Sequence, residues 1–218
     1  MPLWNYKTVV GLILFASGMG KLMGEEIRIP ILSLPDLSQW ESREFVGETH
    51  YQILDQDKQP VLAAVSNSSA SGLFRETKVN LLETPYLHWS WRIENTFANN
   101  NEKIRDGDDY PARIYIIISG GIFFWQTQAL NYVWSSHETK GSFWPNAFSK
   151  NAIMLSVQSG DEQLNTWINE RRNVLQDIKK YLGKENISHV DAVAIMTDSD
   201  NTQGSAKAYY GNIYFSNK

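Results

Sequence analysis

Short stretches that alternate apolar and polar residues follow one another along most of the chain, and turn-forming residues separate them. A period of two is the pattern of a β-strand with one buried face. It predicts strands at residues 50–54, 61–66, 73–82, 86–94, 113–119, 129–135, 153–159, 191–197 and 212–216. Many short strands with turns between them predict an all-β fold, and we expect a β-sandwich.

The segment before the first of these strands is less regular. Residues 27–40 hold several isoleucines and leucines, but Pro30 and Pro35 interrupt them. This predicts an extended lead-in strand and a turn rather than a helix. Because no internal repeat and no low-complexity linker follows, residues 21–218 are expected to form one β-sandwich domain.

One segment fits two periods. The apolar residues of 163–182 have helical spacing, yet the first half also alternates as a strand does. We expect a strand that continues through Val174, followed by one short helix late in the chain, from about Leu175 to Leu182. Gly183 is expected to end this helix, since glycine readily adopts the left-handed conformation that follows a helix.

The first twenty residues have the composition of an export signal. Lys7 precedes a compact apolar run at residues 9–16, and small residues at 16–18 offer a cleavage site. The run is too short for a comfortable membrane span. We therefore expect residues 1–20 to be a signal peptide and the protein to be periplasmic or secreted, with an uncleaved anchor or a buried N-terminal helix as alternatives. No comparable run follows, so no membrane span is expected in the mature protein.

The charge and cysteine content narrow the class of protein. The 218 residues include 20 Lys and Arg, 24 Asp and Glu, and no cysteine, which excludes disulfides, thiol catalysis and iron–sulfur clusters. The net charge of −4 becomes −5 when the leader is removed, because only Lys7 is lost. Nucleic-acid binding is not expected, since a phosphate backbone needs a basic face.

Familiar catalytic motifs are absent. The sequence contains no phosphate-binding loop, no G-x-S-x-G nucleophile elbow and no H-E-x-x-H. The four histidines are scattered, and none has the close partner that a metal site on one element would need. Each is expected to be structural or exposed, although a triad assembled by the fold stays open.

Two acidic segments carry the clearest candidates for polar chemistry. One leads into the strand at 113–119, and the other follows the strand at 191–197. The alternation of Asp198, Asp200 and Thr202 allows a loop to aim three oxygens at a hard cation. The candidate ligands of a structural Ca²⁺ are Asp108, Asp109, Asp198 and Asp200.

Two other interpretations of these aspartates need no metal. The second segment lacks the terminal glutamate of an EF-hand loop, since position 209 is tyrosine. Asp and Asn side chains also cap strand-end loops in Asx turns. A third interpretation is a buried salt bridge between one aspartate and Arg113 or Arg171.

The most aromatic strand, at residues 86–94, has two unlike faces. Period-two geometry places on the first face Leu87, Trp89, Trp91 and Ile93. The second face carries Tyr86, His88, Ser90, Arg92 and Glu94. The first is expected to be core, along with at least five of the eight tryptophans, and the second is typical of a surface that faces a ligand.

Other aromatic rings share strand faces with polar or aromatic residues, an arrangement that is typical of sugar-binding sites. Tyr115 shares a strand face with Arg113, and Trp134 shares one with Tyr132. Sugar rings stack their C–H faces on aromatic rings while polar groups bond the hydroxyls. The candidate ligand-binding residues are Arg113, Tyr110, Tyr115, Trp134 and Arg171.

Ordered motifs along nearly the whole chain resemble a known family. They are SASGL at 69–73, LHWSWR at 87–92, GDDYPARIY at 107–115, YVWS at 132–135, ERRNV at 170–174, AIMTDSDNT at 194–202 and YYGNI at 209–213. In this order they resemble the bacterial family called domain of unknown function 3047. The resemblance implies an exported bacterial protein and brings no activity or catalytic residues. Residues 120–128 depart from it by being more apolar, which suggests a hairpin or a partner contact.

The layout is also similar to jelly-roll carbohydrate-binding modules. These often begin with a Trp-containing turn, here residues 37–40, and end in a strand after an acidic loop. The resemblance implies a jelly-roll, galactose-binding-like sandwich, and it concerns architecture rather than function.

These observations favour a non-catalytic protein that binds carbohydrate, such as a cell-envelope glycan. The first alternative is an enzyme, since a polysaccharide lyase or glycoside hydrolase on the same fold needs only convergent acids, arginines and a His or Tyr. The second is an interaction or scaffold protein, with an apolar contact at residues 123–125. What discriminates among them is whether the acidic and basic candidates meet in one cleft.

Overall fold

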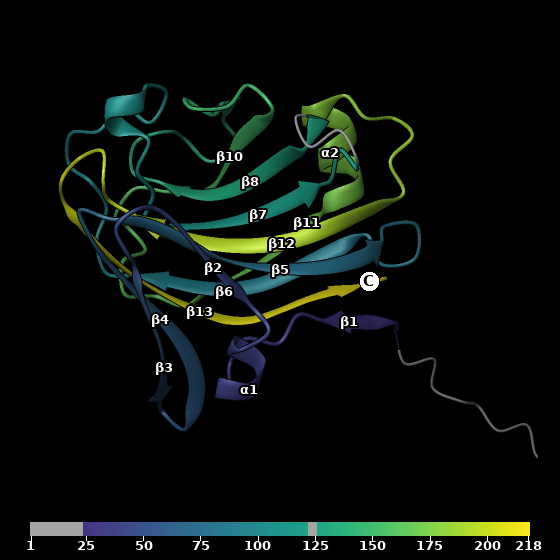
Figure 1. Ribbon diagram of the computed structural model, residues 1–218, viewed down its shortest axis with the longest axis horizontal. Coiled ribbons are helices and arrows are strands. Elements are labelled where there is room, and N and C mark those ends of the chain that lie inside the picture. The colour runs from purple at the N-terminus through teal and green to yellow at the C-terminus, as the bar shows by residue number, and fades with distance from the viewer. Residues whose placement is uncertain (1–23, 122–125) are drawn as a thin grey trace, which may run out of the picture.

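Two β-sheets packed face to face make up the described structure, a computed structural model that covers residues 24–121 and 126–218 (Figure 1). Sheet A contains β1 (Glu26–Arg28), β3 (His50–Gln56), β4 (Gln59–Asn67), β6 (Tyr86–Ile93), β11 (Ile168–Asn173) and β13 (Ser205–Ser216). Sheet B contains β2 (Glu41–Val46), β5 (Ala70–Asn80), β7 (Ala112–Ile118), β8 (Gln128–Ser135), β9 (Phe143–Pro145), β10 (Ala152–Ser159) and β12 (His189–Asp198). The expected all-β sandwich is confirmed.

Segments far apart in sequence pair within each sheet. Sheet A has the order β11-β6-β13-β4-β3, with β1 also paired to β13, and sheet B has the order β2-β5-β12-β7-β8-β10-β9. The described neighbours are antiparallel except β8 and β10, which are parallel. The central strands β7 and β12 therefore bring the two acidic segments, one before β7 and one after β12, to the same end of sheet B.

A single large apolar cluster between the sheets explains the alternating pattern. The inward residues of β6 are at most 2% exposed, as expected: Leu87, Trp89, Trp91 and Ile93. The buried tryptophans of the described chain are Trp40, Trp89, Trp91, Trp134 and Trp144. The expectation that at least five tryptophans are core is thus confirmed, although most residues of the large cluster are aliphatic.

The late helix begins one residue before the expected start. β11 ends at Asn173, and α2 (Val174–Leu182) follows directly. The Asn173 side chain accepts a hydrogen bond from the Gln176 amide at 3.0 Å, which caps the first turn. Gly183 ends the helix with a φ of +66°, a conformation that favours glycine. The sequence predicted the role of Gly183, whereas Asn173 was not singled out as the cap.

Other short elements differ from the expectation. The lead-in of residues 27–40 contains one helical turn, α1 (Leu34–Leu37), and a 3₁₀ turn (Arg105–Gly107) precedes β7. The edge strand β2 was not predicted because all six of its residues are exposed and give no apolar alternation. None of the helices in the described ranges is long or apolar enough to cross a membrane.

The leader expected at residues 1–20 and the apolar contact expected at 123–125 lie outside the described residues.

Candidate functional site

The outward face of sheet B gathers most of the predicted site residues. On β7, Ile114 and Ile116 point into the core, so the alternate residues Arg113 and Tyr115 point away from sheet A. The neighbouring strand β12 pairs Met196 with Arg113. The outward residues of both strands therefore lie side by side, at the end where the acidic loops meet.

Two adjoining pockets hollow this face. One has a volume of about 290 Å³ and is lined by Phe45, Val46, Ala70, Asp108, Arg113, Tyr115, Asn146, Phe148, Met196, Asp198, Asp200 and Asn201. The other, of about 630 Å³, is lined by Gln39, Glu41, Arg43, Phe74, Glu76, Ile117, Ser119, Thr127, Asp191 and Ala192. Phe74 of the second pocket and Tyr115 of the first have ring centroids 6.2 Å apart, so the pockets meet at these rings.

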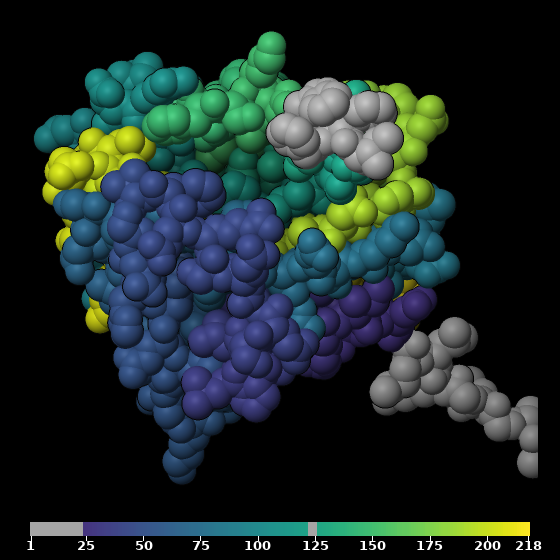
Figure 2. Space-filling view, viewed as in Figure 1, coloured from purple at the N-terminus to yellow at the C-terminus, as the bar shows by residue number. Residues whose placement is uncertain are grey.

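We call these two pockets together the sheet B groove. Figure 2 views this side of the molecule, where the atoms of β7 and β12 are set back between the purple-blue N-terminal segment and the green segment around residues 140–150. The groove thus follows β7 and β12, and its rings lie in the smaller pocket and where the two pockets meet.

A buried ion pair forms the wall of the smaller pocket. The Arg113 guanidinium donates to the Asp198 carboxylate, and their side chains are 5% and 2% exposed. The guanidinium also packs between two rings, 4.9 Å from the centroid of Tyr110 and 5.5 Å from that of Tyr115. Burial raises the pKa of the Asp198 carboxyl, and Arg113 opposes this rise by favouring the charged carboxylate.

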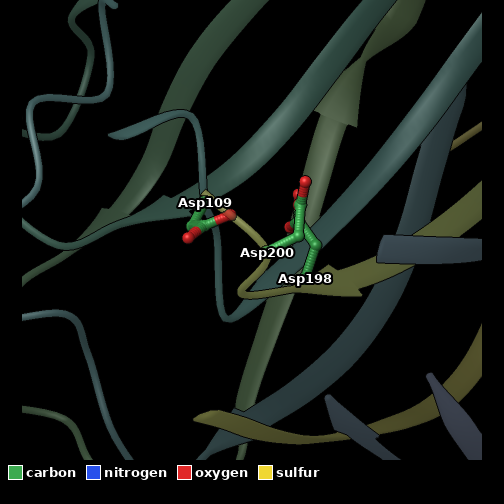
Figure 3. A group of neighbouring side chains, drawn as sticks. All are labelled: Asp109, Asp198 and Asp200. Carbon is green, nitrogen blue, oxygen red and sulfur yellow. The ribbon is translucent and has the colours of Figure 1, made fainter. Parts of the chain in front are cut away.

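The second acidic loop is held by Asp109. Its carboxylate accepts hydrogen bonds from the backbone amides of Asn201 at 3.1 Å and Thr202 at 2.6 Å. Figure 3 shows Asp109 arriving from the segment before β7, while Asp198 and Asp200 come from the end of β12 and the loop after it. This is Asx-type capping, but it joins two segments far apart in sequence rather than neighbours within one loop.

Asp108 lies at the groove with two donors of its own. Its carboxylate accepts hydrogen bonds from the Tyr110 hydroxyl at 3.0 Å and from the Asn146 amide at 2.8 Å. Burial raises the pKa of Asp108, and it also raises the pKa of Asp200, with the nearby Asp109 charge adding to the second shift. The smaller pocket therefore carries more negative charge than Arg113 balances.

A metal site would use the same oxygens. One carboxylate oxygen from each of Asp109, Asp198 and Asp200 lies within 4.8 Å of the others. Both oxygens of Asp109 already accept backbone amides, and one oxygen of Asp198 accepts the amide of Tyr110 while the other pairs with Arg113. These contacts match the salt-bridge and Asx interpretations directly, and the calcium interpretation stays a prediction.

Three predicted ligand-binding residues do not line the groove. Trp134 is fully buried in the core, because the pairing of β8 with β7 places it opposite the inward residue Ala112. It cannot stack on a ligand at the surface, and the same is true of Tyr110, which is 0% exposed and supports Arg113 from below. Arg171 lies on sheet A, where its guanidinium covers the Tyr86 ring at 4.0 Å.

Several groove residues were not singled out from the sequence. Phe74 faces outward on β5, Phe45 belongs to the unpredicted strand β2, and Asn146 and Phe148 follow β9. For Phe74, the alternation of its strand placed this ring on the outward face, which was the one sequence signal for any of these residues. The loop residues carried none, because their placement depends on how β9 pairs with β10.

The fold and this face together define a two-sheet β-sandwich protein with an aromatic, acidic groove across one sheet. The chain belongs to the family described as Protein of unknown function (DUF3047), whose profile matches residues 38–214. The expected family is thereby confirmed. No curated protein matches the sequence.

Solved structures share the layout at low identity. The family 11 carbohydrate-binding module from Clostridium thermocellum aligns with a TM-score of 0.45 and 10% identity over 88% of this chain and 95% of that one. The family 30 carbohydrate-binding module of a cellulosomal cellulase from the same organism aligns with a TM-score of 0.49 and 12% identity over 88% of this chain and 96% of that one. A cellulase derived from Cel12A of Rhodothermus marinus aligns with a TM-score of 0.43 and 11% identity over 88% of this chain and 100% of that one. At these scores we transfer no function from them.

Proposed function

We propose that this protein binds a polysaccharide along the sheet B groove without catalysing a reaction. The observation that carries the proposal is the pair of half-buried rings, Phe74 and Tyr115, where two pockets with polar walls meet. Aromatic faces suit the C–H faces of sugar rings, and the surrounding carboxylates and amides suit hydroxyls. An open groove across a sheet suits an extended chain better than a small molecule.

The charge of the groove restricts the kind of polysaccharide. Its lining includes six carboxylates and two guanidinium groups, and each guanidinium is paired with a carboxylate. The excess negative charge disfavours uronate polymers, because like charges repel across a binding interface. Neutral polysaccharides are therefore the expected ligands.

The paired carboxylates support a binding rather than a catalytic role. Asp198 is held by Arg113, and Asp109 is held by two backbone amides, so both stabilise the loops that form the pocket. A second candidate function is glycoside hydrolysis, which one observation favours. Asp108 and Asp200 line the same pocket, and the pKa of each is raised, as an acid catalyst needs.

Export to the periplasm or the medium belongs to the same proposal. A signal peptide at residues 1–20, read from the sequence, would place the protein where polysaccharides of the cell envelope occur. N-terminal sequencing of the protein recovered from the periplasm tests this, since a start near residue 21 is expected and a start at Met1 would contradict it.

Binding to a neutral-glycan array, followed by affinity measurement on the variants Phe74→Ala and Tyr115→Ala, tests the proposed function. Each variant should weaken binding at least tenfold, and their combination should abolish it. Phe143→Ala is the matched control, because Phe143 is 55% exposed on β9 and lies outside the groove. Binding that survives the double variant would overturn the proposal, and release of reducing ends from the bound glycan would favour hydrolysis.

A further inference from the structure

The outward face of sheet A carries a separate pocket, on the opposite side of the sandwich from the sheet B groove. Its volume is about 330 Å³, and it is lined by Leu32, Gln56, Asp57, Gln59, Pro60, Val61, Ser90, Trp167, Asn169, Gly211 and Asn212. We call it the Trp167 pocket. Ser90 belongs to the polar face of the aromatic strand that the sequence marked as typical of a ligand surface.

Gly211 of β13 lies beside both Ser90 and Trp167. A Cβ atom on Gly211 would lie 2.1 Å from the Ser90 hydroxyl, which would have to rotate away, and 3.6 Å from the Trp167 ring, an ordinary contact distance. The pairing of β13 with β6 also shifts register between Tyr210 and Ile213, which marks an irregularity at the same place. The indole thus lies close to the strand while 36% of the residue stays exposed.

The amide side chains around the indole are free to hydrogen-bond a ligand. The side chains of Gln56, Gln59, Asn169 and Asn212 form no side-chain hydrogen bond with another group in the described ranges of the chain. Several other asparagines of the described chain do form such bonds, and Asn100, for example, donates to two backbone carbonyls. Four amides with free donors and acceptors therefore line one pocket beside an open ring.

The pocket has little charge. Asp57 is the one ionisable residue in its lining. Arg92 lies beside the pocket, but its guanidinium stacks 4.1 Å from the Tyr209 ring and 5.8 Å from the Trp167 ring. An open indole with neutral amides around it matches the C–H faces and the hydroxyls of an uncharged sugar, and it matches neither a phosphate nor a purely apolar ligand.

We propose that the Trp167 pocket is a second glycan-binding site, which takes an uncharged sugar residue stacked on Trp167. The two sites lie on opposite faces of the sandwich, so one protein molecule can hold two polysaccharide chains at once. The class of ligand rests on the proposed function, whereas the existence of the second site rests on the geometry of sheet A.

Isothermal titration of the full-length protein with cellohexaose and xylohexaose tests this proposal. The wild type should bind two hexasaccharides per chain. Trp167→Ala should bind one, and the remaining site should be lost when Phe74→Ala and Tyr115→Ala are added. Asn169→Ala provides a milder variant that leaves the ring in place and should weaken the second site several-fold. Gln163→Ala is the control on the exposed segment before Trp167.

The outcomes separate the two proposals. A stoichiometry of one that Trp167→Ala leaves unchanged, and that the groove variants abolish, overturns the second site and supports the sheet B groove. A stoichiometry of one that Trp167→Ala abolishes overturns the groove and supports the Trp167 pocket. If neither hexasaccharide binds, the second site is overturned, and the neutral-glycan array decides the sheet B groove separately.

Discussion

At the scale of single residues, the buried pair of Arg113 and Asp198 organises the candidate site. It joins the strand that follows the first acidic segment to the strand that precedes the second, across 85 residues of sequence. A buried ion pair costs desolvation of both charges, so loss of one partner leaves an uncompensated charge in the interior. The stability of the pocket wall should therefore depend on both partners.

Arg113→Met should lower the free energy of unfolding by about 3–5 kcal/mol, because it leaves Asp198 buried and unpaired. Urea unfolding at pH 7 measures this. Arg171→Met is the matched control, since Arg171 is exposed on sheet A and its loss should cost less than about 1 kcal/mol. A cost below about 1 kcal/mol for Arg113→Met would contradict the account.

The same experiment separates the pair from a metal site. If Arg113 is the counter-charge of the acidic cluster, addition of calcium chloride should leave the unfolding midpoint of the wild type unchanged. A ligand that binds only the native state raises its stability. A clear rise of the unfolding midpoint with calcium would therefore mean that the aspartates bind the metal.

Glu102 should make stability depend on pH. Its carboxyl is 2% exposed, and burial raises its pKa from 4.5 to about 7, against the hydrogen bonds that it accepts from Ser135 and Ser136. The unfolded chain therefore loses this proton before the folded one does. Stability from Glu102 should be fully present below pH 4.5 and fall by roughly 3 kcal/mol as the pH rises to about 7.

Unfolding of the wild type and of Glu102→Gln at pH 5 and pH 8 measures this contribution. The amide does not titrate, so the variant should show a smaller loss of stability between the two pH values. An equal pH dependence in both proteins would mean that Glu102 does not carry the effect.

At the scale of elements, the sequence predicted the strands and the helix that depend on interactions between residues close in sequence. The alternating strands and α2 follow from side-chain periodicity, and Gly183 ends the helix with the expected left-handed conformation. Sequence reasoning failed where an element depends on its neighbours. The exposed edge strand β2 has no buried face of its own, and the inward direction of Trp134 is set by the pairing of β8 with β7.

The cap of α2 should contribute measurably to stability. Asn173→Ala removes the hydrogen bond to the Gln176 amide and should cost about 1 kcal/mol in the free energy of unfolding. Denaturant unfolding of this variant beside Gln176→Ala, which keeps the cap, measures the difference. Equal stability of the two variants would show that the cap contributes nothing.

At the scale of the whole molecule, the sequence predicted the residue types of the site better than their arrangement. The aspartates and Arg113 were identified as candidates, but their convergence needed the antiparallel pairing of β7 with β12. The groove also needs β2 and β5 on one side, which bring Phe45 and Phe74 toward Tyr115 from strands distant in sequence. Such long-range pairing is not encoded in any single segment.

The central claim is that a neutral polysaccharide occupies the sheet B groove. A nuclear magnetic resonance titration of the isotope-labelled protein, with the neutral hexasaccharide that binds best, tests it most directly. We predict saturable shifts in the amide signals of Phe74, Tyr115 and Asn146, which line the two pockets. Saturable binding that leaves all three signals unmoved, or no saturable binding of any neutral hexasaccharide, would contradict the account.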